Sequence, residues 1–182
     1  MTHTALILVD IQNDYFAGGR MALPAMEAAA TNAAATLDLA RARNHDIIHI
    51  RHIAPADAPF FGEGTKGSEI HTSVKPRKGE HVVEKTRPNS FVGTGLDDHL
   101  RAAGVDKLII CGAMSQMCID ATTRAAVDLG YKVTLVSDAC AAASANFDGV
   151  DVPAEQVHAA IMAPLAARYA SVVKAADLAG SA

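Results

Sequence analysis

The chain has 182 residues, of which 50% are hydrophobic, 20% charged and only 4% aromatic, and its formal net charge is −4. This length and composition indicate one globular domain with a full hydrophobic core, which needs no disulfides for stability. The scattered positive residues form no basic face for nucleic acid. No apolar stretch approaches the roughly 20 residues of a membrane span. We therefore expect neither a nucleic-acid nor a membrane partner.

The three cysteines are Cys111, Cys118 and Cys140. An odd number of cysteines in a chain that needs no disulfides is typical of a reducing compartment. We expect a cytoplasmic protein with at least one free thiol.

Apolar runs alternate with helical patterns along the whole chain. The predicted strands are 5–10, 46–52, 82–85, 107–112, 132–137 and 170–173. The predicted helices are 25–44, 94–103, 115–129 and 153–168. Residues 53–80, rich in glycine and proline, are expected to form a long excursion that acts as a lid or as a contact with a neighbouring copy. This alternation predicts an α/β sandwich with a mostly parallel sheet, in which ligands bind beyond the carboxyl ends of the strands.

Two helices have recognisable start signals. Thr94 with Asp97 three residues later predicts a capping box. Ser115 is a suitable N-cap residue, which makes Cys118 the third residue of its helix and places the thiol near the positive end of the helix dipole. This position favours the thiolate form of Cys118.

Asp10, Lys85 and Cys118 each lie at or just beyond the end of a predicted strand. If the strands are parallel, the three side chains can converge at one edge of the sheet. The thiol would be a nucleophile, the ammonium would favour its anion, and the carboxylate could accept and return a proton. Each residue also has an ordinary interpretation, as a small buried side chain, a turn residue or a solvated strand edge.

The order of motifs resembles one family throughout. Four segments are similar to the motifs of the isochorismatase-like cysteine hydrolases. They are LVDIQNDYFAGG (8–19), EKTRPNSFVGTGLDDHL (84–100), IICGAMSQMCIDATTRAA (109–126) and TLVSDACAA (134–142). That superfamily includes nicotinamidases and N-carbamoylsarcosine amidohydrolase. The resemblance implies a Rossmann-like three-layer α/β/α sandwich with a six-stranded, mostly parallel sheet, formed by a single domain over residues 1–182.

The same resemblance implies specific roles for individual residues. Asp10, Lys85 and Cys118 match the family's catalytic triad. A cis peptide is implied between Ala113 and Met114, with the backbone N–H groups of Met114 and Cys118 forming an oxyanion hole.

The substrate pocket is less well defined. Tyr15 aligns with a pocket aromatic of the family, and Phe91, Met114 and Met117 are plausible neighbours, although core packing explains each of them equally well. The scarce aromatic residues suggest a pocket wall on the active-site side. Its predicted members are Tyr15, Phe16, Phe60, Phe61 and Phe91.

No metal and no cofactor is expected. The family's Asp-x-His metal motif is replaced by the stretch 51–54, and His49 and His52 are three apart on a strand, hence on opposite faces. Gly62, Gly64 and Gly67 match a dinucleotide motif but lack the strand and helix that it requires.

The resulting hypothesis is a cysteine-dependent hydrolase of a small amide or carbamoyl C–N bond, acting through a thioester. We expect a small-molecule substrate and a homo-oligomer, a dimer or larger. The alternatives are a non-catalytic small-molecule-binding α/β domain, vinyl ether hydrolysis of the isochorismatase type, and, more remotely, a thiol redox protein. Cysteine-dependent turnover would separate the hypothesis from the binding domain and from vinyl ether hydrolysis. The redox alternative lacks the Cys-x-x-Cys pair that such proteins normally need.

Overall fold

The computed structural model describes residues 3–180, so the predicted domain 1–182 extends beyond the described residues at both ends. A six-stranded sheet has the order β3-β2-β1-β4-β5-β8, and every neighbouring pair is parallel. Its strands are β1 His3–Val9, β2 Asp46–His52, β3 His81–Lys85, β4 Val105–Ala113, β5 Lys132–Ala141 and β8 Ala170–Val173. The predicted sheet is confirmed, with all six strands close to their expected positions.

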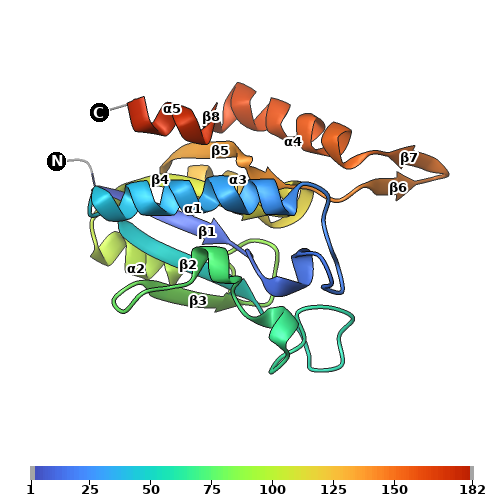
Figure 1. Cartoon of the computed structure of the whole chain (residues 1–182). Coiled ribbons are helices and arrows are strands. Elements are labelled where there is room, and N and C mark those ends of the chain that lie inside the picture. Colours follow the sequence, from blue (N-terminus) through green and yellow to red (C-terminus); the bar gives the residue numbers. More distant parts are fainter. Residues whose placement is uncertain (1–2, 181–182) are drawn as a thin grey trace.

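Helices cover both faces of the sheet (Figure 1). They are α1 Met26–Ala42, α2 Leu96–Ala102, α3 Asp120–Asp128, α4 Ala154–Arg168 and α5 Ala175–Gly180. From β1 the chain adds β2 and β3 on one side of the sheet, and then β4, β5 and β8 on the other side. Because the crossovers are right-handed, α1 lies on one face of the sheet and α2, α3 and α4 lie on the other face. In agreement, α1 packs against α5 and β5, while α3 packs against α4. Among the described residues, no helix has the length and apolar character needed to cross a membrane.

Small side chains explain how closely α1 lies on the sheet. The chain contains 37 alanines, and Ala29, Ala30, Ala33 and Ala40 form much of the buried face of α1. Beneath them, residues 5–9 of β1 are buried throughout, as expected of a central strand covered on both faces. The large apolar residues of the core therefore come mainly from the strands.

A hairpin and a terminal helix were not predicted. Strands β6 Ala145–Phe147 and β7 Val150–Val152 pair antiparallel and project from the body of the molecule (Figure 1). Asp148 and Gly149 connect them with positive φ angles of 50° and 76°, which suits the Asp-Gly hairpin signal. That dipeptide was a usable sequence signal for the hairpin.

The excursion 53–80 is fastened to the segment that follows β1. It contains two short 3₁₀ turns, η2 Lys66–Ser68 and η3 Thr72–Val74. The buried Gln12 side chain donates hydrogen bonds to the carbonyls of His52 and Ser68, each at 2.9 Å, and accepts one from the His52 amide at 2.8 Å. One glutamine thus holds the two arms of the excursion together beside the end of β1.

The predicted capping box is wrong. Helix α2 begins at Leu96, with Gly95 as the N-cap residue. The Thr94 hydroxyl donates to the Ser90 carbonyl at 2.6 Å, and the Asp97 carboxylate instead accepts from Tyr131 and Arg101. Thr94 bonds within its own loop and accepts weakly from the Leu96 amide at 3.4 Å, whereas Asp97 takes a tertiary partner, Tyr131, instead of closing the cap.

Candidate active site

The carboxyl edge of the sheet brings Asp10, Lys85 and Cys118 together. The Lys85 ammonium Nζ lies 2.7 Å from Asp10 Oδ2 and 3.2 Å from Cys118 Sγ. The side chains of Asp10 and Lys85 are 0% exposed, and Cys118 is 5% exposed. Three residues from distant parts of the sequence thus form one buried carboxylate–ammonium–thiol cluster.

Asp10 directly follows β1 and leaves the strand conformation. Its φ of 51° is in the left-handed region, while its amide still donates to the Ile50 carbonyl at 3.1 Å. Aspartate tolerates this conformation better than most residues. The backbone change ends the strand alternation at the residue whose carboxylate joins the cluster.

Lys85 is placed by the register of β3 on β2. The pairing sets Lys85 beside His52, and residues in register on parallel strands point to the same face. His52 Nδ1 accordingly lies 3.2 Å from Lys85 Nζ, which also donates to the Arg87 carbonyl at 3.0 Å. His52 is therefore a fourth polar member of the cluster. The sequence analysis considered it only as a metal ligand and gave it no other role.

Cys118 lies on a one-turn π-helix, η4 Ser115–Ile119, that precedes α3. The Ile119 amide donates to the Met114 carbonyl at 3.2 Å, and the expected cis peptide joins Ala113 to Met114. The prediction of a single α-helix over 115–129 is therefore wrong in its first turn, because five residues fill the turn instead of four. Such π turns are frequent at functional sites.

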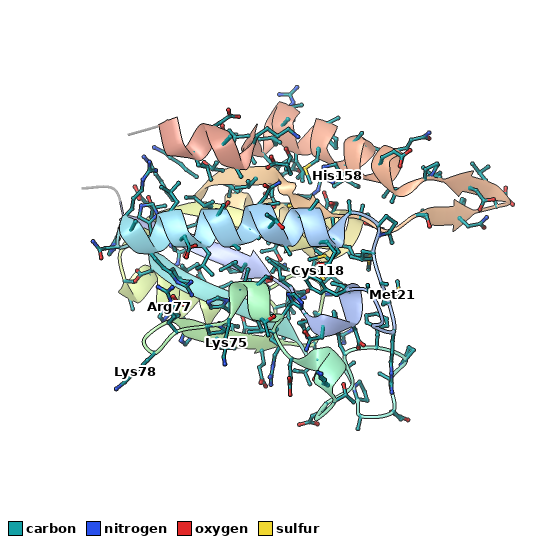
Figure 2. All side chains as sticks on the ribbon, viewed as in Figure 1. Met21, Lys75, Arg77, Lys78, Cys118 and His158 are labelled. Atoms are coloured by element: carbon teal, nitrogen blue, oxygen red, sulfur yellow. The ribbon has the colours of Figure 1, made fainter. Side chains whose placement is uncertain are left out.

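Ser115 is not the N-cap residue that its type suggested. Met114 takes that position, and the Ser115 hydroxyl lies 3.2 Å from the Ala141 carbonyl and 2.8 Å from His158 Nδ1. In Figure 2, Cys118 lies below His158 of α4. Ser115 thus fastens the cysteine turn to β5 and α4.

Burial is the largest cause of the pKa shifts in the cluster. It raises the pKa of the Cys118 thiol, and the nearby Asp10 charge adds to this effect, which Lys85 only partly offsets. Burial likewise raises the pKa of Asp10 against the opposing effect of Lys85, and burial followed by the Lys85 charge lowers the pKa of His52. The direction for Cys118 is opposite to the one that its helix position suggested, and it favours a neutral thiol beside a neutral imidazole.

Part of the predicted aromatic wall lies beside the cluster. The buried Tyr15 ring meets Phe61 edge-on at 4.7 Å, and Phe61 lies 5.1 Å from Phe60 and 5.9 Å from His52, measured between ring centres. Burial raises the pKa of Tyr15, and the nearby Asp10 carboxylate adds to this effect. These rings form an apolar flank for the cluster.

The other proposed pocket residues have different surroundings. Phe16 stacks on His71 at 3.6 Å, and Phe91 stacks at 6.1 Å on Tyr131, which precedes β5 at the amino edge of the sheet. The wall therefore does not gather all five aromatic residues. Met117 is 45% exposed, so its contact with substrate, like that of Phe91, stays a prediction.

The cluster includes ligand types that zinc accepts. Atoms of Asp10, His52 and Cys118 lie within 4.8 Å of one another. The Lys85 ammonium, however, lies against all three side chains. The lysine thus supplies the positive charge that a metal ion would bring, and the residues do not favour a metal centre. His49, by contrast, bonds Glu80.

Two cavities lie on the carboxyl side of the sheet, and one of them is lined by a residue of the cluster. One of about 340 Å³ is lined by His52, Ile53, Ala54, Pro55, Glu63 and Thr86. The other, about 350 Å³, lies between α1, the end of β5 and the start of α4, where His158 lines it. Through His52 the cluster borders the 340 Å³ cavity.

A doubly wound parallel sheet with a polar cluster at the carboxyl ends of its strands is typical of α/β domains whose ligands bind at that edge. Residues 4–177 match the family model of the Isochorismatase domain. The chain belongs to this family, whose members are hydrolases.

Individual relatives agree with the assignment. The chain is 48% identical over 170 residues to the uncharacterized isochorismatase family protein YddQ of Bacillus subtilis, covering 93% of this chain and 94% of that protein. A crystal structure assigned to the isochorismatase hydrolases, from Oleispira antarctica, superposes with a TM-score of 0.96 at 46% identity, covering 99% and 97% of the two chains. N-carbamoylsarcosine amidase from Thermoplasma acidophilum superposes with a TM-score of 0.81 at 25% identity over 96% and 97%.

Proposed function

We propose that this chain is a cysteine-dependent hydrolase of a small amide or carbamoyl C–N bond. The observation that supports it most directly is the buried ammonium of Lys85, 2.7 Å from the Asp10 carboxylate and 3.2 Å from the Cys118 thiol. A thiol nucleophile beside a proton acceptor and a fixed positive charge is suited to acyl transfer. The likeness to an enzyme named N-carbamoylsarcosine amidase supports the C–N substrate class.

In the first half of the proposed reaction, Cys118 Sγ attacks the carbonyl carbon while its proton passes to Asp10. Burial raises the pKa of Asp10, so this carboxylate is a better base than a solvated one. Lys85 stabilises the sulfur as its negative charge develops. The amides of Met114 and Cys118 receive the oxyanion, and Asp10 then gives the proton to the departing nitrogen.

In the second half, water hydrolyses the thioester. Asp10, again ionised, takes a proton from the water as its oxygen attacks the acyl carbon, and the thiol recovers its proton when the acid leaves. Asp10 returns the proton taken from water to the sulfur, so the same carboxylate acts first as a base and then as an acid in each half of the reaction. The apolar flank of Tyr15 and Phe61 limits the water that reaches the intermediate.

A cytoplasmic location fits this chemistry. All three cysteines are free and buried, and a reducing compartment keeps a nucleophilic thiol active.

Parallel assays of the wild type and Cys118→Ala test the proposal. The substrates are a panel of small primary amides, carbamoyl compounds and isochorismate. We expect ammonia release from at least one amide or carbamoyl compound, and loss of at least a thousandfold in Cys118→Ala with the circular dichroism spectrum unchanged.

The matched control is Cys140→Ala, which removes a buried thiol outside the cluster and should keep turnover. Hydrolysis that survives in Cys118→Ala would contradict the mechanism. Turnover of isochorismate alone would instead favour vinyl ether hydrolysis, and binding without any turnover would favour the non-catalytic domain.

A further inference from the structure

The Lys85 ammonium has more acceptors than it has hydrogens. A protonated lysine donates three hydrogen bonds. Four acceptors lie within reach of Nζ: Asp10 Oδ2 at 2.7 Å, the Arg87 carbonyl at 3.0 Å, and both His52 Nδ1 and Cys118 Sγ at 3.2 Å. At any moment one of the four receives no hydrogen from Lys85.

The two nearer acceptors form the strongest hydrogen bonds with Lys85. Asp10 is charged and is fully buried with Lys85, and the Arg87 carbonyl is fixed by the backbone two residues beyond the lysine. The competition is therefore between His52 and Cys118, which lie at equal distance. A neutral thiol is a weak acceptor, whereas a neutral imidazole is a good one.

His52 is suited to this competition by its surroundings. Its backbone is held by Gln12, so the ring stays beside Lys85. Burial and the Lys85 charge keep the imidazole neutral, as an acceptor must be. The ring also borders the 340 Å³ cavity. Its Nδ1 can accept a hydrogen bond from water there when the Lys85 N–H points elsewhere.

We propose that His52 is a positioning residue, which holds the third hydrogen of Lys85 while Cys118 is a thiol and yields it to Sγ when the thiolate forms. His52 neither gains nor loses a proton in this exchange. The thiol proton passes to Asp10, and the only change at Lys85 is the direction of one N–H. The proposal deepens the proposed function and rests on the same cluster.

The exchange makes a measurable prediction for Cys118. Replacing His52 by leucine removes the competing acceptor, so Lys85 bonds the sulfur throughout and the thiolate becomes easier to form. We expect the pKa of Cys118 to fall by about one unit. The alkylation rate of this thiol at pH 7 should rise about threefold, because a roughly tenfold larger thiolate fraction is partly offset by its lower nucleophilicity.

The experiment measures iodoacetamide labelling against pH, with the modified Cys118 peptide quantified by mass spectrometry. The other charged or titratable groups facing the thiol, Asp10, Lys85 and Tyr15, are unchanged in every variant. His52→Gln keeps an acceptor and should resemble the wild type. His81→Leu is the matched control, because exposed His81 begins the other end of β3 and stacks on His99 at 4.2 Å.

An unchanged or higher Cys118 pKa in His52→Leu would overturn the proposal, as would an equal fall in His52→Gln. A second measurement does not depend on the leucine variant. Nitrogen NMR of the wild type near pH 7 should show His52 with its proton on Nε2, since Nδ1 accepts from Lys85. A proton on Nδ1 would also overturn it.

Neither measurement requires a substrate. If His52→Leu leaves the pKa unchanged while the wild type hydrolyses an amide through Cys118, the exchange fails and the proposed function stands. If the pKa falls as expected but no compound is hydrolysed in a Cys118-dependent way, the exchange stands and the proposed function fails.

Discussion

Lys85 is the residue on which the charge balance of the cluster depends. It is fully buried, pairs with Asp10 at 2.7 Å and contacts the sulfur and imidazole that surround it. Removing one partner of a buried ion pair leaves the other charge without compensation, which costs about 3 to 5 kcal/mol. The lysine therefore has both a structural and a proposed chemical role.

For Lys85→Met we expect loss of hydrolysis and a fall of about 3 kcal/mol in the free energy of unfolding, because Asp10 stays buried without its counter-charge. Urea denaturation at pH 7 measures the second effect. Lys132→Met changes an exposed lysine at the start of β5 and should alter neither property. Wild-type stability in Lys85→Met would show that the ion pair contributes little.

At the scale of elements, Glu80 ties α1, β2 and the end of the excursion together. Its carboxylate accepts from Arg41 of α1 at 2.7 Å and from the Arg77 amide at 2.8 Å, and lies 2.9 Å from His49 of β2. Burial alone would raise the pKa of Glu80, but these hydrogen bonds outweigh it and lower the pKa to about 2. The excursion is thus anchored by a charge near the start of β3.

Because the pKa of Glu80 is lowered on folding, its stabilisation is complete above the ordinary value of 4.5 and is lost as pH falls toward about 2. We expect Glu80→Gln to reduce the free energy of unfolding by about 2 kcal/mol at pH 7. Urea denaturation from pH 7 to pH 3 should show this difference shrinking. Glu69→Gln, an exposed control, should have no such effect, and a difference independent of pH would contradict the assignment.

Gly112 sets the spacing between β1 and β4 at the end that holds the cluster. It is in register with Val9 and has a φ of 130°. A Cβ atom there would overlap the Val9 carbonyl oxygen. A side chain at this position would push apart the strands that carry Asp10 and the cysteine turn.

We expect Gly112→Ala to lower the free energy of unfolding by about 3 kcal/mol through overlap and backbone strain combined. Gly104→Ala is the control, because its φ of 68° is also positive but no atom lies within 4 Å of the added Cβ. It should cost only about 1 to 2 kcal/mol. Thermal or urea unfolding of the two variants compares them, and equal losses would show that the close approach is unimportant.

At the scale of the whole molecule, the projecting hairpin exposes apolar side chains. Phe147 is 84% exposed and Val150 61% exposed. Two-stranded hairpins are marginal in water without a packing partner. This surface is compatible with the predicted homo-oligomer and lies on a different segment from the excursion 53–80, which was the first candidate for a contact.

Sedimentation velocity tests the assembly directly. We expect a dimer or larger species, because self-association would cover the apolar side chains of the hairpin. A Phe147→Ser variant should then sediment more slowly or show weaker association. A single species of 18.9 kDa over the accessible concentration range would contradict the prediction of an oligomer.

Periodicity was sufficient to predict the parallel sheet, because buried parallel strands have a continuous apolar pattern. The strand-end positions of Asp10, Lys85 and Cys118 allowed these residues to meet at one edge, and the family resemblance selected them. Local signals failed where a distant partner competed for the same atoms. Ser115 bonds β5 and α4 instead of its own helix, and Asp97 bonds Tyr131. The Asp-Gly turn of the hairpin was visible in the sequence but was overlooked.

The sequence by itself determined the α/β architecture, and its resemblance to the family implied the cis peptide position and the three residues that meet at the sheet edge. Only the tertiary structure decided the direction in which the pKa of Cys118 shifts, since that pKa depends on burial and on the charges of Asp10 and Lys85. It also decided the place of His52, because the register of β2 on β3 sets that ring against Lys85. Residue types identify the chemical groups of a site, but the packing of distant segments sets the energies with which those groups act.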